Sequence, residues 1–293
     1  MNIIMFVLVM GGLGAGMGSF ACCQVCRLRR QEEGKKKLGS RSVCLFCHKQ
    51  LKWYENIPIL SWVLQRGKCR KCGKEIGKAE ILSEVAGAVS FMMLGAWFAG
   101  KYFPQFFELG LGGTPRAWTW AWFLVLLIFM TVLLVLAIYD ARYGKLPVGV
   151  LYGGVAVAGV FMIARAVSLG FTAVDVTATG ERIFEFTGID WKGFLLARGA
   201  AAGLLGGIYY ILYKVSNEKL VGGGDWLVCL MIGMVLGDWW LALWELFVAN
   251  FLGAAVMLGR RKKRTAFGPF LVVAFVIGVT FSTQLQMMKL GMV

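Results

Sequence analysis

Residues 133–147 read LLVLAIYDARYGKLP, and they close an apolar run that begins near residue 118. This run has about the ~20 residues that a helix needs to cross the hydrocarbon core of a bilayer, and it stops at Asp140. A second stretch, VGGGDWLVCL at residues 221–230, sets Asp225 among glycines and apolar side chains. A charged aspartate at the centre of a membrane helix costs about 2.5–3.5 kcal/mol, so both aspartates are candidates for function.

Composition places the whole chain in a membrane. Of its 293 residues 58% are hydrophobic and only 16% are charged, against roughly 25% charged in soluble domains. Long apolar runs recur without the alternation of an outer-membrane barrel, so helices are the expected spans. The predicted fold class is an all-α polytopic membrane protein with about eight transmembrane helices. The expected spans are 3–22, 81–100, 118–139, 146–167, 194–213, 221–237, 239–258 and 267–287.

The spans divide the chain into three expected parts. These are a first transmembrane helix at 1–22, a basic loop at 23–80 and a membrane domain at 81–293 that holds the other spans. The first span has no basic segment before its apolar part, so we expect it to be retained rather than cleaved as a signal peptide. Residues 237–240, GDWW, fit an outward hairpin with an interfacial aromatic pair or the middle of one long tilted helix.

Charge sets the expected orientation. The loop at 27–80 holds 15 Lys and Arg against five acids, which gives +10 of the chain's net +15. Cytoplasmic loops carry an excess of Lys and Arg, and the loops on the same side by alternation, 140–145, 214–220 and 259–266, are also basic. We therefore expect an inner-membrane protein with this loop and both aspartates on the cytoplasmic side and both termini outside. The charge suits anionic lipid headgroups, and we expect no nucleic-acid partner.

Four cysteines in the basic loop predict a structural zinc site. Cys44-x-x-Cys47 and Cys69-x-x-Cys72 are separated by 21 residues, which is close to the spacing of a four-cysteine zinc ribbon. A loop this short and basic cannot build a core, so a metal would hold it together. Disulfides are disfavoured in a reducing compartment. The haem-attachment pattern C-x-x-C-H, completed by His48, is disfavoured by the second C-x-x-C.

Other cysteines lie in apolar surroundings. Cys23 and Cys26 form a third C-x-x-C where the first span ends, without a matching pair. We interpret them as small buried residues at the membrane edge, and Cys229 as a packing residue within the sixth span.

The two aspartates could act together. Carboxylates a few ångströms apart in a low-dielectric site cannot easily both ionise, so such a pair shares one proton. One member can then take a proton from water while the other protonates the peptide carbonyl oxygen or the leaving amine. Gly222, Gly223 and Gly224 remove side-chain bulk beside Asp225 and would let a substrate backbone approach closely, although a simple helix break explains them as well.

Several stretches carry a family pattern when they are taken in order. They are Gly18-Ser19-Phe20, Arg41-Ser42, LKWYENIPILSWVLQRGKCRKC at 51–72, Glu84, Asp140 with Leu146-Pro147, Gly222-Gly223-Gly224-Asp225 and Phe267-Gly268-Pro269-Phe270. In these stretches the chain resembles the bacterial type IV prepilin peptidases, which are membrane aspartyl proteases of the G-x-G-D type.

The resemblance implies removal of short basic leader peptides from type IV prepilins or pseudopilins at the cytoplasmic membrane face. Asp140 and Asp225 would be the catalytic pair. Many family members also methylate the new N-terminus with S-adenosylmethionine, so this cofactor is a further expectation. Cys22 stands where the family usually has asparagine after G-S-F, and methylation is therefore a separate expectation from proteolysis.

Two other classes of function fit parts of the sequence. A non-catalytic zinc-ribbon membrane scaffold of an export or pilus assembly would need the cysteines but not the aspartates. A carboxylate-gated transporter would place its acids near the middle of the bilayer, whereas Asp140 and Asp225 are expected at span ends.

Overall fold

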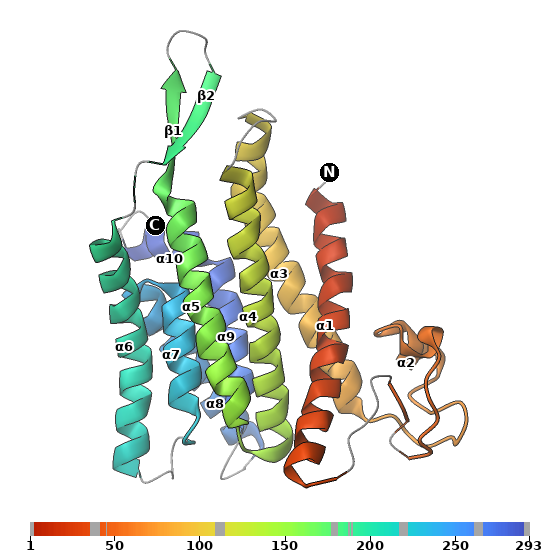
Figure 1. The fold of residues 1–293 in the computed structure, drawn as a ribbon. Coiled ribbons are helices and arrows are strands. Elements are labelled where there is room, and N and C mark those ends of the chain that lie inside the picture. The colour runs from red at the N-terminus through yellow and green to blue at the C-terminus, as the bar shows by residue number, and fades with distance from the viewer. Residues whose placement is uncertain are drawn as a thin grey trace. The chain divides into compact units, whose positions relative to one another are not determined.

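The computed structural model describes most of the chain and arranges it as two compact units. The described residues are 3–35, 42–44, 46–108, 115–176, 181–186, 188, 190–216, 222–260 and 266–289. One unit is Met1–Ala96 and the other is Trp97–Val293 (Figure 1). Helix α3 (Lys78–Glu108) runs through both units, and the division expected from the sequence, at residues 22 and 80, stays a prediction.

The first unit consists of two long helices and the basic insert between them. The insert carries a short 3-10 helix, η1 (Trp53–Asn56), and α2 (Leu60–Leu64). The first helix, α1 (Ile3–Glu32), continues ten residues beyond the expected end of the first span. Its last turns are charged, and Arg29 Nε donates to Glu33 Oε1 at 2.8 Å, one turn further along the chain.

Glycines allow α1 and α3 to pack with their backbones in contact. A Cβ built on Gly14 would overlap the backbone of Gly87, and one on Gly18 would overlap the carbonyl oxygen of Ser83. Small residues at such positions let membrane helices approach closely, and the approach is what gives the pair its van der Waals attraction. Gly14 and Gly18 are four residues apart in α1 and therefore lie on the same face of this helix.

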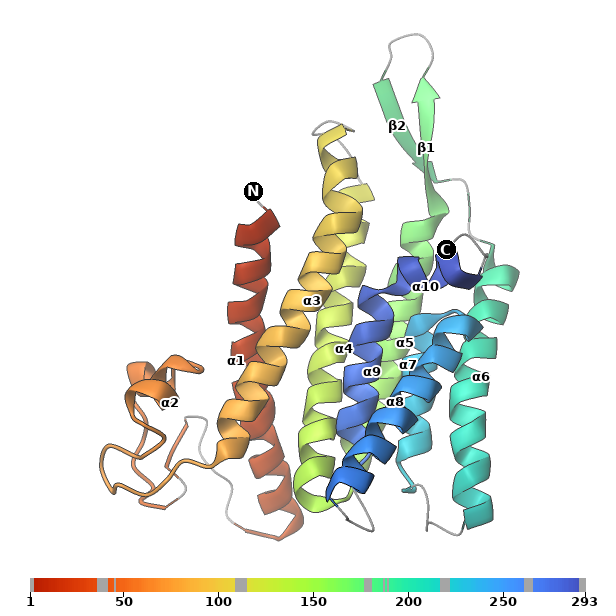
Figure 2. The same cartoon turned by 180° about the vertical axis from the view of Figure 1, so that it is seen from behind.

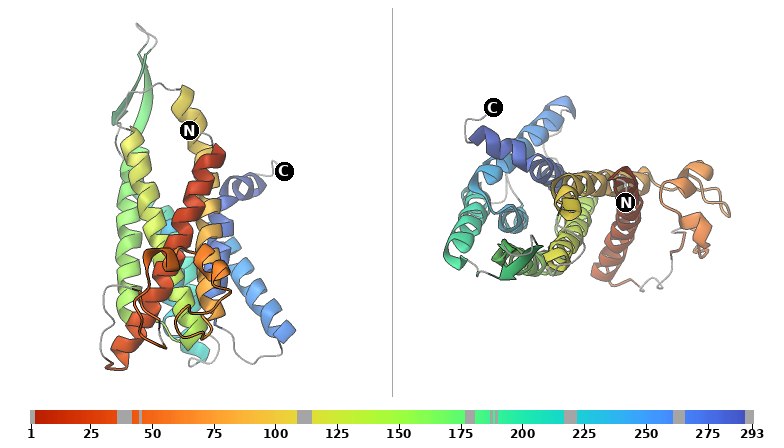
Figure 3. Two further views of the ribbon diagram at one scale, coloured as in Figure 1. Left: turned by 90° about the vertical axis from the view of Figure 1, so that its right-hand side faces the viewer. Right: turned by 90° about the horizontal axis from the view of Figure 1, so that it is seen from above.

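The second unit is a bundle with one helix in its centre. Its elements are the end of α3, α4 (Pro115–Tyr143), α5 (Val148–Gly170), β1 (Phe171–Val176), β2 (Glu181–Phe186), α6 (Trp191–Ser216), α7 (Asp225–Leu236), α8 (Trp239–Arg260), α9 (Gly268–Thr280) and α10 (Ser282–Lys289). Helix α7 packs against α5, α6, α8 and α9, and the view from above shows it surrounded by these helices (Figure 3). After Asp225 it is apolar on every side, which is typical of a fully buried helix.

The fold class is confirmed, and the structure refines the number of spans. Among the described residues six helices are long and apolar enough to cross a membrane, and α9 with α10, bent by 72°, could form a seventh. The sixth expected span, at 221–237, is wrong as a full crossing because α7 has 12 residues, or about 18 Å, against a core of about 30 Å. A β1–β2 hairpin with Phe171 opposite Phe186 replaces part of the expected loop at 168–193.

A break separates α7 from α8 and decides between the two interpretations of residues 237–240. The backbone of Gly237 is left-handed, with φ of 66°, and Asp238 Oδ1 accepts the N–H of Trp240 at 2.8 Å. Arg198 Nη1 donates to the last carbonyl groups of α7, on Met234 and Val235, at 2.6 and 2.9 Å. One long tilted helix is therefore wrong, and two helices meet at this turn.

Replacing Gly18 by alanine tests the α1–α3 contact. The new Cβ would meet the Ser83 carbonyl, and such overpacking typically costs about 1–3 kcal/mol. The matched control is Gly16→Ala, because nothing lies within 4 Å of a Cβ there and alanine favours a helix over glycine by about 1 kcal/mol. We expect G18A to lower the unfolding temperature of the protein in detergent and G16A to leave it equal or higher. Equal shifts for both variants would contradict the close packing.

Candidate metal centre and carboxylate pair

Two similar turns present the four cysteines of the insert. Isolated antiparallel bridges, Val43 with Gln50 and Lys68 with Glu75, close the turns. In each turn the N–H of the first cysteine donates to the carbonyl oxygen of the residue five positions later. The N–H of the residue four positions later donates to the carbonyl oxygen of that cysteine, and all these distances are 2.9 Å. The residue after the second cysteine, His48 or Gly73, has a positive φ of 52° or 69°. His48 is an exposed residue of the first turn.

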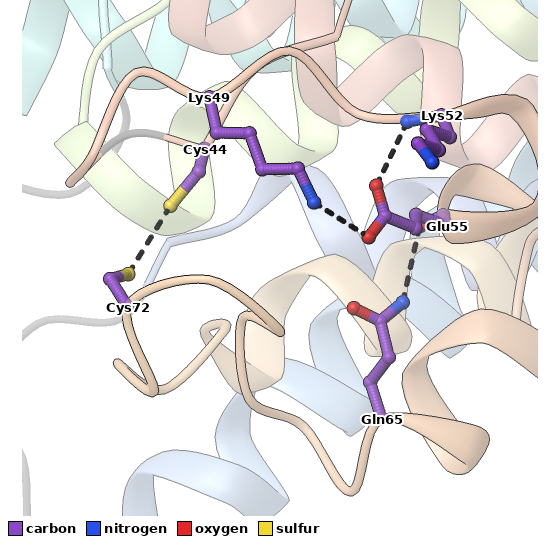
Figure 4. Close-up of polar contacts among 6 residues, drawn as sticks. All are labelled: Cys44, Lys49, Lys52, Glu55, Gln65 and Cys72. Carbon is purple, nitrogen blue, oxygen red and sulfur yellow. Dashed lines mark hydrogen bonds and ion pairs between the residues drawn. The ribbon is translucent and has the colours of Figure 1, made fainter.

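The sulfur atoms of the two turns meet in one cluster. The Sγ atoms of Cys44, Cys47, Cys69 and Cys72 all lie within 4.8 Å of one another. Those of Cys44 and Cys72 are 3.9 Å apart, well beyond the S–S bond length of about 2.05 Å (Figure 4). Zn–S bonds of about 2.3 Å in a tetrahedron separate neighbouring sulfurs by about 3.8 Å. The four residues therefore fit a zinc ion after small shifts of the sulfur atoms.

Backbone N–H groups favour the thiolate form of one cysteine of this cluster, Cys69, whereas burial and the neighbouring sulfurs raise the pKa of Cys72 to about 11. The N–H groups of Cys72 and Lys71 are directed at the Cys69 sulfur and lower the pKa of that thiol to about 6. A thiolate is the form of cysteine that binds metal, so the backbone of the second turn prepares one ligand for it.

Glu55 ties the first cysteine turn to the following helices. Its Oε1 accepts Lys49 Nζ and its Oε2 accepts the N–H of Lys52, both at 2.9 Å, and its carbonyl oxygen accepts Gln65 Nε2 at 3.3 Å (Figure 4). The N–H of Lys52 and the ammonium of Lys49 hold the pKa of the Glu55 carboxyl below its usual range. The side chain is buried although charged, so polar contacts and the cysteine cluster organise the insert where an apolar core is lacking.

Asp140 lies near the end of α4 and is buried. Its Oδ2 accepts the N–H of Gly268, the first residue of α9, at 2.7 Å. A Cβ at position 268 would lie 3.1 Å from this oxygen, so glycine leaves room for the carboxyl group beside the helix terminus. The amino end of a helix carries partial positive charge, which suits a carboxylate.

Asp225 begins α7 and is also buried. Its Oδ2 accepts the N–H of Gly222 at 2.9 Å. Gly222 and Gly223 are exposed, whereas a Cβ on Gly224 would lie 2.9 Å from Leu146 Cδ1. The three glycines thus differ, because the first two leave open space beside the aspartate and the third permits close packing.

The structure brings the two aspartates to the same end of the second unit. The last turn of α4 and the first turn of α7 lie together at the lower end of the bundle in both Figure 1 and Figure 2. Helix α9 packs against both α4 and α7, so the two aspartates lie on helices that share one neighbour. Their catalytic role stays a prediction.

Other buried polar side chains of this unit were not assigned from the sequence. Tyr209 in α6 packs its ring 5.6 Å from that of Phe267, and its hydroxyl accepts Asn250 Nδ2 at 2.8 Å. Glu245 in α8 is 1% exposed, and neither of its carboxyl oxygens has a hydrogen-bond partner among the described residues. The sequence shows Tyr209 and Asn250 only as polar residues within apolar runs. It does not indicate that their side chains form a hydrogen bond with each other.

Fold and site together define a multi-pass membrane protein with a four-cysteine cluster that could hold a metal and two buried carboxyl groups at one end of a helix bundle. Residues 13–98 match the family model described as Bacterial Peptidase A24 N-terminal domain. The chain is similar over most of its length to several curated proteins named prepilin leader peptidase/N-methyltransferase. These matches confirm the resemblance to the prepilin peptidases.

Three of these relatives show the extent of the likeness. The protein from Myxococcus xanthus is 29% identical over 254 residues, which are 86% of this chain and 62% of that protein. The one from Bacillus subtilis is 28% identical over 86% of this chain and 84% of its own length. The one from Dickeya chrysanthemi is 28% identical over 82% of this chain and 73% of its own. The matched part thus spans less than two thirds of the Myxococcus relative. No solved structure matches the chain.

Metal analysis tests the cysteine cluster. Elemental analysis of the purified protein should give about one zinc per chain, because four thiolates complete one tetrahedral site. We expect Cys44→Ser and Cys69→Ser each to lose the metal and Cys26→Ser, which changes a thiol outside the cluster, to retain it. Metal-free protein with intact thiols, or zinc retained by both cluster variants, would refute the site.

Proposed function

We propose that the chain is a membrane-embedded aspartyl endopeptidase that removes basic leader peptides from type IV prepilins or pseudopilins. The observation that carries the proposal is the pair Asp140 and Asp225, both buried, each accepting a glycine N–H, at the same end of the bundle (Figure 1). The names of the similar proteins support the choice of substrate.

The proposed hydrolysis uses both carboxyl groups and forms no covalent intermediate. Because two charges so close in a low-dielectric site repel each other, the pair holds one proton. The ionised member takes a proton from water, and the water oxygen attacks the scissile carbonyl carbon. The protonated member donates its proton to the carbonyl oxygen, and the C–N bond then breaks as the amine leaving group is protonated. The N–H groups of Gly268 and Gly222 keep the carboxyl groups oriented through these steps.

The glycines before Asp225 suit the approach of an extended substrate. Gly222 and Gly223 are exposed and carry no side chain that would keep a peptide backbone from the carboxyl group. A prepilin offers a basic leader followed by an apolar helix, so the scissile bond would lie where water and lipid meet. Gly224 would contribute by packing rather than by contact with substrate.

The proposed location is the bacterial inner membrane with the basic insert and the aspartate pair on the cytoplasmic side. The net +10 of residues 27–80 supports this orientation and contact with anionic lipids, and both termini would lie outside. Large apolar side chains exposed along α1, such as Leu8 and Val9, fit direct contact with lipid. Nucleic acid is not a proposed partner.

Methyl transfer is the proposed second activity, and zinc has a structural role. The similar proteins are also named N-methyltransferases. S-adenosylmethionine would supply the methyl group from its sulfonium, the new N-terminal amine would accept it and lose a proton, and S-adenosylhomocysteine would be released. Zinc bound by the four cysteines would hold the two turns of the insert together.

The main alternative is a non-catalytic zinc-ribbon scaffold of an export or pilus assembly, which the cysteine cluster alone would support. Co-expression with a prepilin separates the two functions. Asp140→Asn and Asp225→Asn should each abolish leader removal, measured by the mass of the pilin N-terminus, because an amide cannot exchange the shared proton. The control Asp238→Asn changes a carboxylate that caps Trp240 and should process normally. Normal processing by either of the first two variants would favour the scaffold.

Gly268→Ala tests whether the position of Asp140 matters. The new Cβ would lie 3.1 Å from Asp140 Oδ2 and 3.3 Å from its Cβ, so the carboxyl group must shift. We expect leader removal to slow by about tenfold or more, since small displacements of catalytic groups have large effects. In the control Gly253→Ala the nearest atom is 3.5 Å away, and the rate should be unchanged. Equal rates for the two variants would show that the contact with α9 does not set the geometry of the pair.

A further inference from the structure

The helices of the second unit fall into two classes of length. Helices α4, α5 and α6 have 29, 23 and 26 residues, so the shortest of them is about 35 Å long and can cross a hydrocarbon core of about 30 Å. Helices α7 and α9 have 12 and 13 residues, or about 18 and 20 Å. Figure 2 shows α9 with α10 and the obliquely inclined α8 on one side of the unit, and we call these three helices the short flank.

The short helices begin level with the long ones, at the end that holds the aspartates. The ring of Trp226, in the first turn of α7, lies 5.3 Å from that of Tyr210 in α6. The N–H of Gly268, at the start of α9, donates to Asp140 near the end of α4. Aromatic side chains such as Trp226 and Tyr210 are typical of the boundary between lipid and water. The four helices therefore share one boundary at this end.

At the opposite end the short helices stop well before the long ones. Helix α6 begins at Trp191, and Arg198 lies about 10 Å further along its axis. A Cβ on Gly237, which follows the last residue of α7, would lie 3.1 Å from Arg198 Cγ. The Arg198 guanidinium is also 5.7 Å from the ring of Phe161, and α5 continues from there to Gly170, about 13 Å further. Helix α7 thus ends about 10 Å short of both neighbours.

Helix α10 marks where water begins on the short flank. It follows α9 after a bend of 72° and turns across the end of the bundle (Figure 1). Of its eight described residues only Leu285 is buried. Hydrocarbon does not accommodate exposed amide and charged side chains, so α10 belongs at the level of the lipid headgroups. Its exposed polar side chains are Thr283, Gln284, Gln286 and Lys289.

Three contacts fix α10 at this level. Trp240 Nε1 donates to the Leu285 carbonyl oxygen at 2.9 Å. Lys289 Nζ lies 3.5 Å from Asp238 Oδ1 and 5.0 Å from the centre of the Trp239 ring. These contacts join α10 to the turn between α7 and α8, so the polar boundary cannot move away from the ends of the short helices.

Below α10 the short flank is apolar and exposed. Phe247 and Phe251 of α8 and Val273 of α9 are among its exposed side chains. The apolar height of this flank is the length of α9, about 20 Å, against about 30 Å for an ordinary hydrocarbon core. A span that is too short is accommodated by a thinner bilayer, by side chains that reach the interface or by association. The amides of Gln284 and Gln286 are too short to reach across about 10 Å.

We propose that the short flank is a lipid-binding surface that thins the bilayer beside it, in the leaflet opposite the aspartates, and favours phospholipids with short acyl chains. Its polar strip above an apolar face has the same profile as a lipid monolayer whose headgroups come down to α10. A protein partner that covered this flank would have to bury the exposed amides. The inference does not depend on the proposed peptidase activity.

Footprinting of the full-length protein in bilayers of 18-carbon monounsaturated phosphatidylcholine tests the thinning. Met287 and Met288 of α10 are 45% and 50% exposed, so hydroxyl radicals formed in water should oxidise them. Met162 of α5 is the matched control, because it follows Phe161 and lies level with the end of α7 where α5 still has hydrocarbon beside it. We expect at least tenfold less oxidation at Met162. A diazirine probe dissolved in the acyl chains should give the reverse order.

Lipid selection gives a second measurement. From bilayers with equal amounts of 14- and 18-carbon phosphatidylcholine, mild extraction should leave the protein at least twofold enriched in the shorter lipid, counted by mass spectrometry. The double variant Gln284→Leu with Gln286→Leu lets α10 enter hydrocarbon, so we expect it to lose the enrichment and the oxidation of Met287 and Met288. The control Lys192→Leu changes an exposed residue at the start of the long helix α6 and should keep both.

Three results would overturn the proposal. They are oxidation of Met287 and Met288 no greater than that of Met162, absence of enrichment, and equal enrichment in the double variant. Protection of α10 from both the radical and the diazirine would show that protein covers the flank instead of lipid, and it would overturn the proposal as well. The unfolding temperature of each variant is measured alongside. If the double variant does not fold, the footprint of the unaltered protein decides the question.

Discussion

Two carboxyl groups buried at the ends of apolar helices constrain how the second unit is built. Each carboxyl group needs a hydrogen-bond donor where water is scarce, and a backbone N–H is the smallest donor available. Gly268 and Gly222 supply it, and a Cβ at either position would crowd the same oxygen that their N–H groups bind, so glycine suits both positions. The start of α9 and the loop before α7 thus hold the carboxyl groups in place. The bundle places both aspartates at the same end (Figure 1).

The first unit meets a different constraint, since its insert is too small and too basic for an apolar core. The buried Glu55 carboxylate and the four cysteines, which could hold a metal ion, organise the insert in place of that core.

Features that depend on a short segment were predictable from the sequence. Runs of apolar residues predicted the six long spans, and two C-x-x-C turns predicted the cysteine cluster, because each turn closes on itself within six residues. Features that depend on distant contacts were not. Hydropathy does not reveal that α7 ends after 12 residues. There Arg198 of another helix donates hydrogen bonds to the last carbonyl groups of α7. Nor does it reveal the hydrogen bond between Asp140 and Gly268, which are 128 residues apart.

Cross-linking of the two aspartate positions tests the central claim most directly. In the variant with Asp140→Cys and Asp225→Cys, a short bifunctional thiol reagent added to membranes should join the two positions, and mass spectrometry should identify the linked peptides. Both thiols should react with a membrane-impermeant reagent only when it has access to the cytoplasmic face. Absence of any link, or labelling of the two positions from opposite faces of the membrane, would contradict the account.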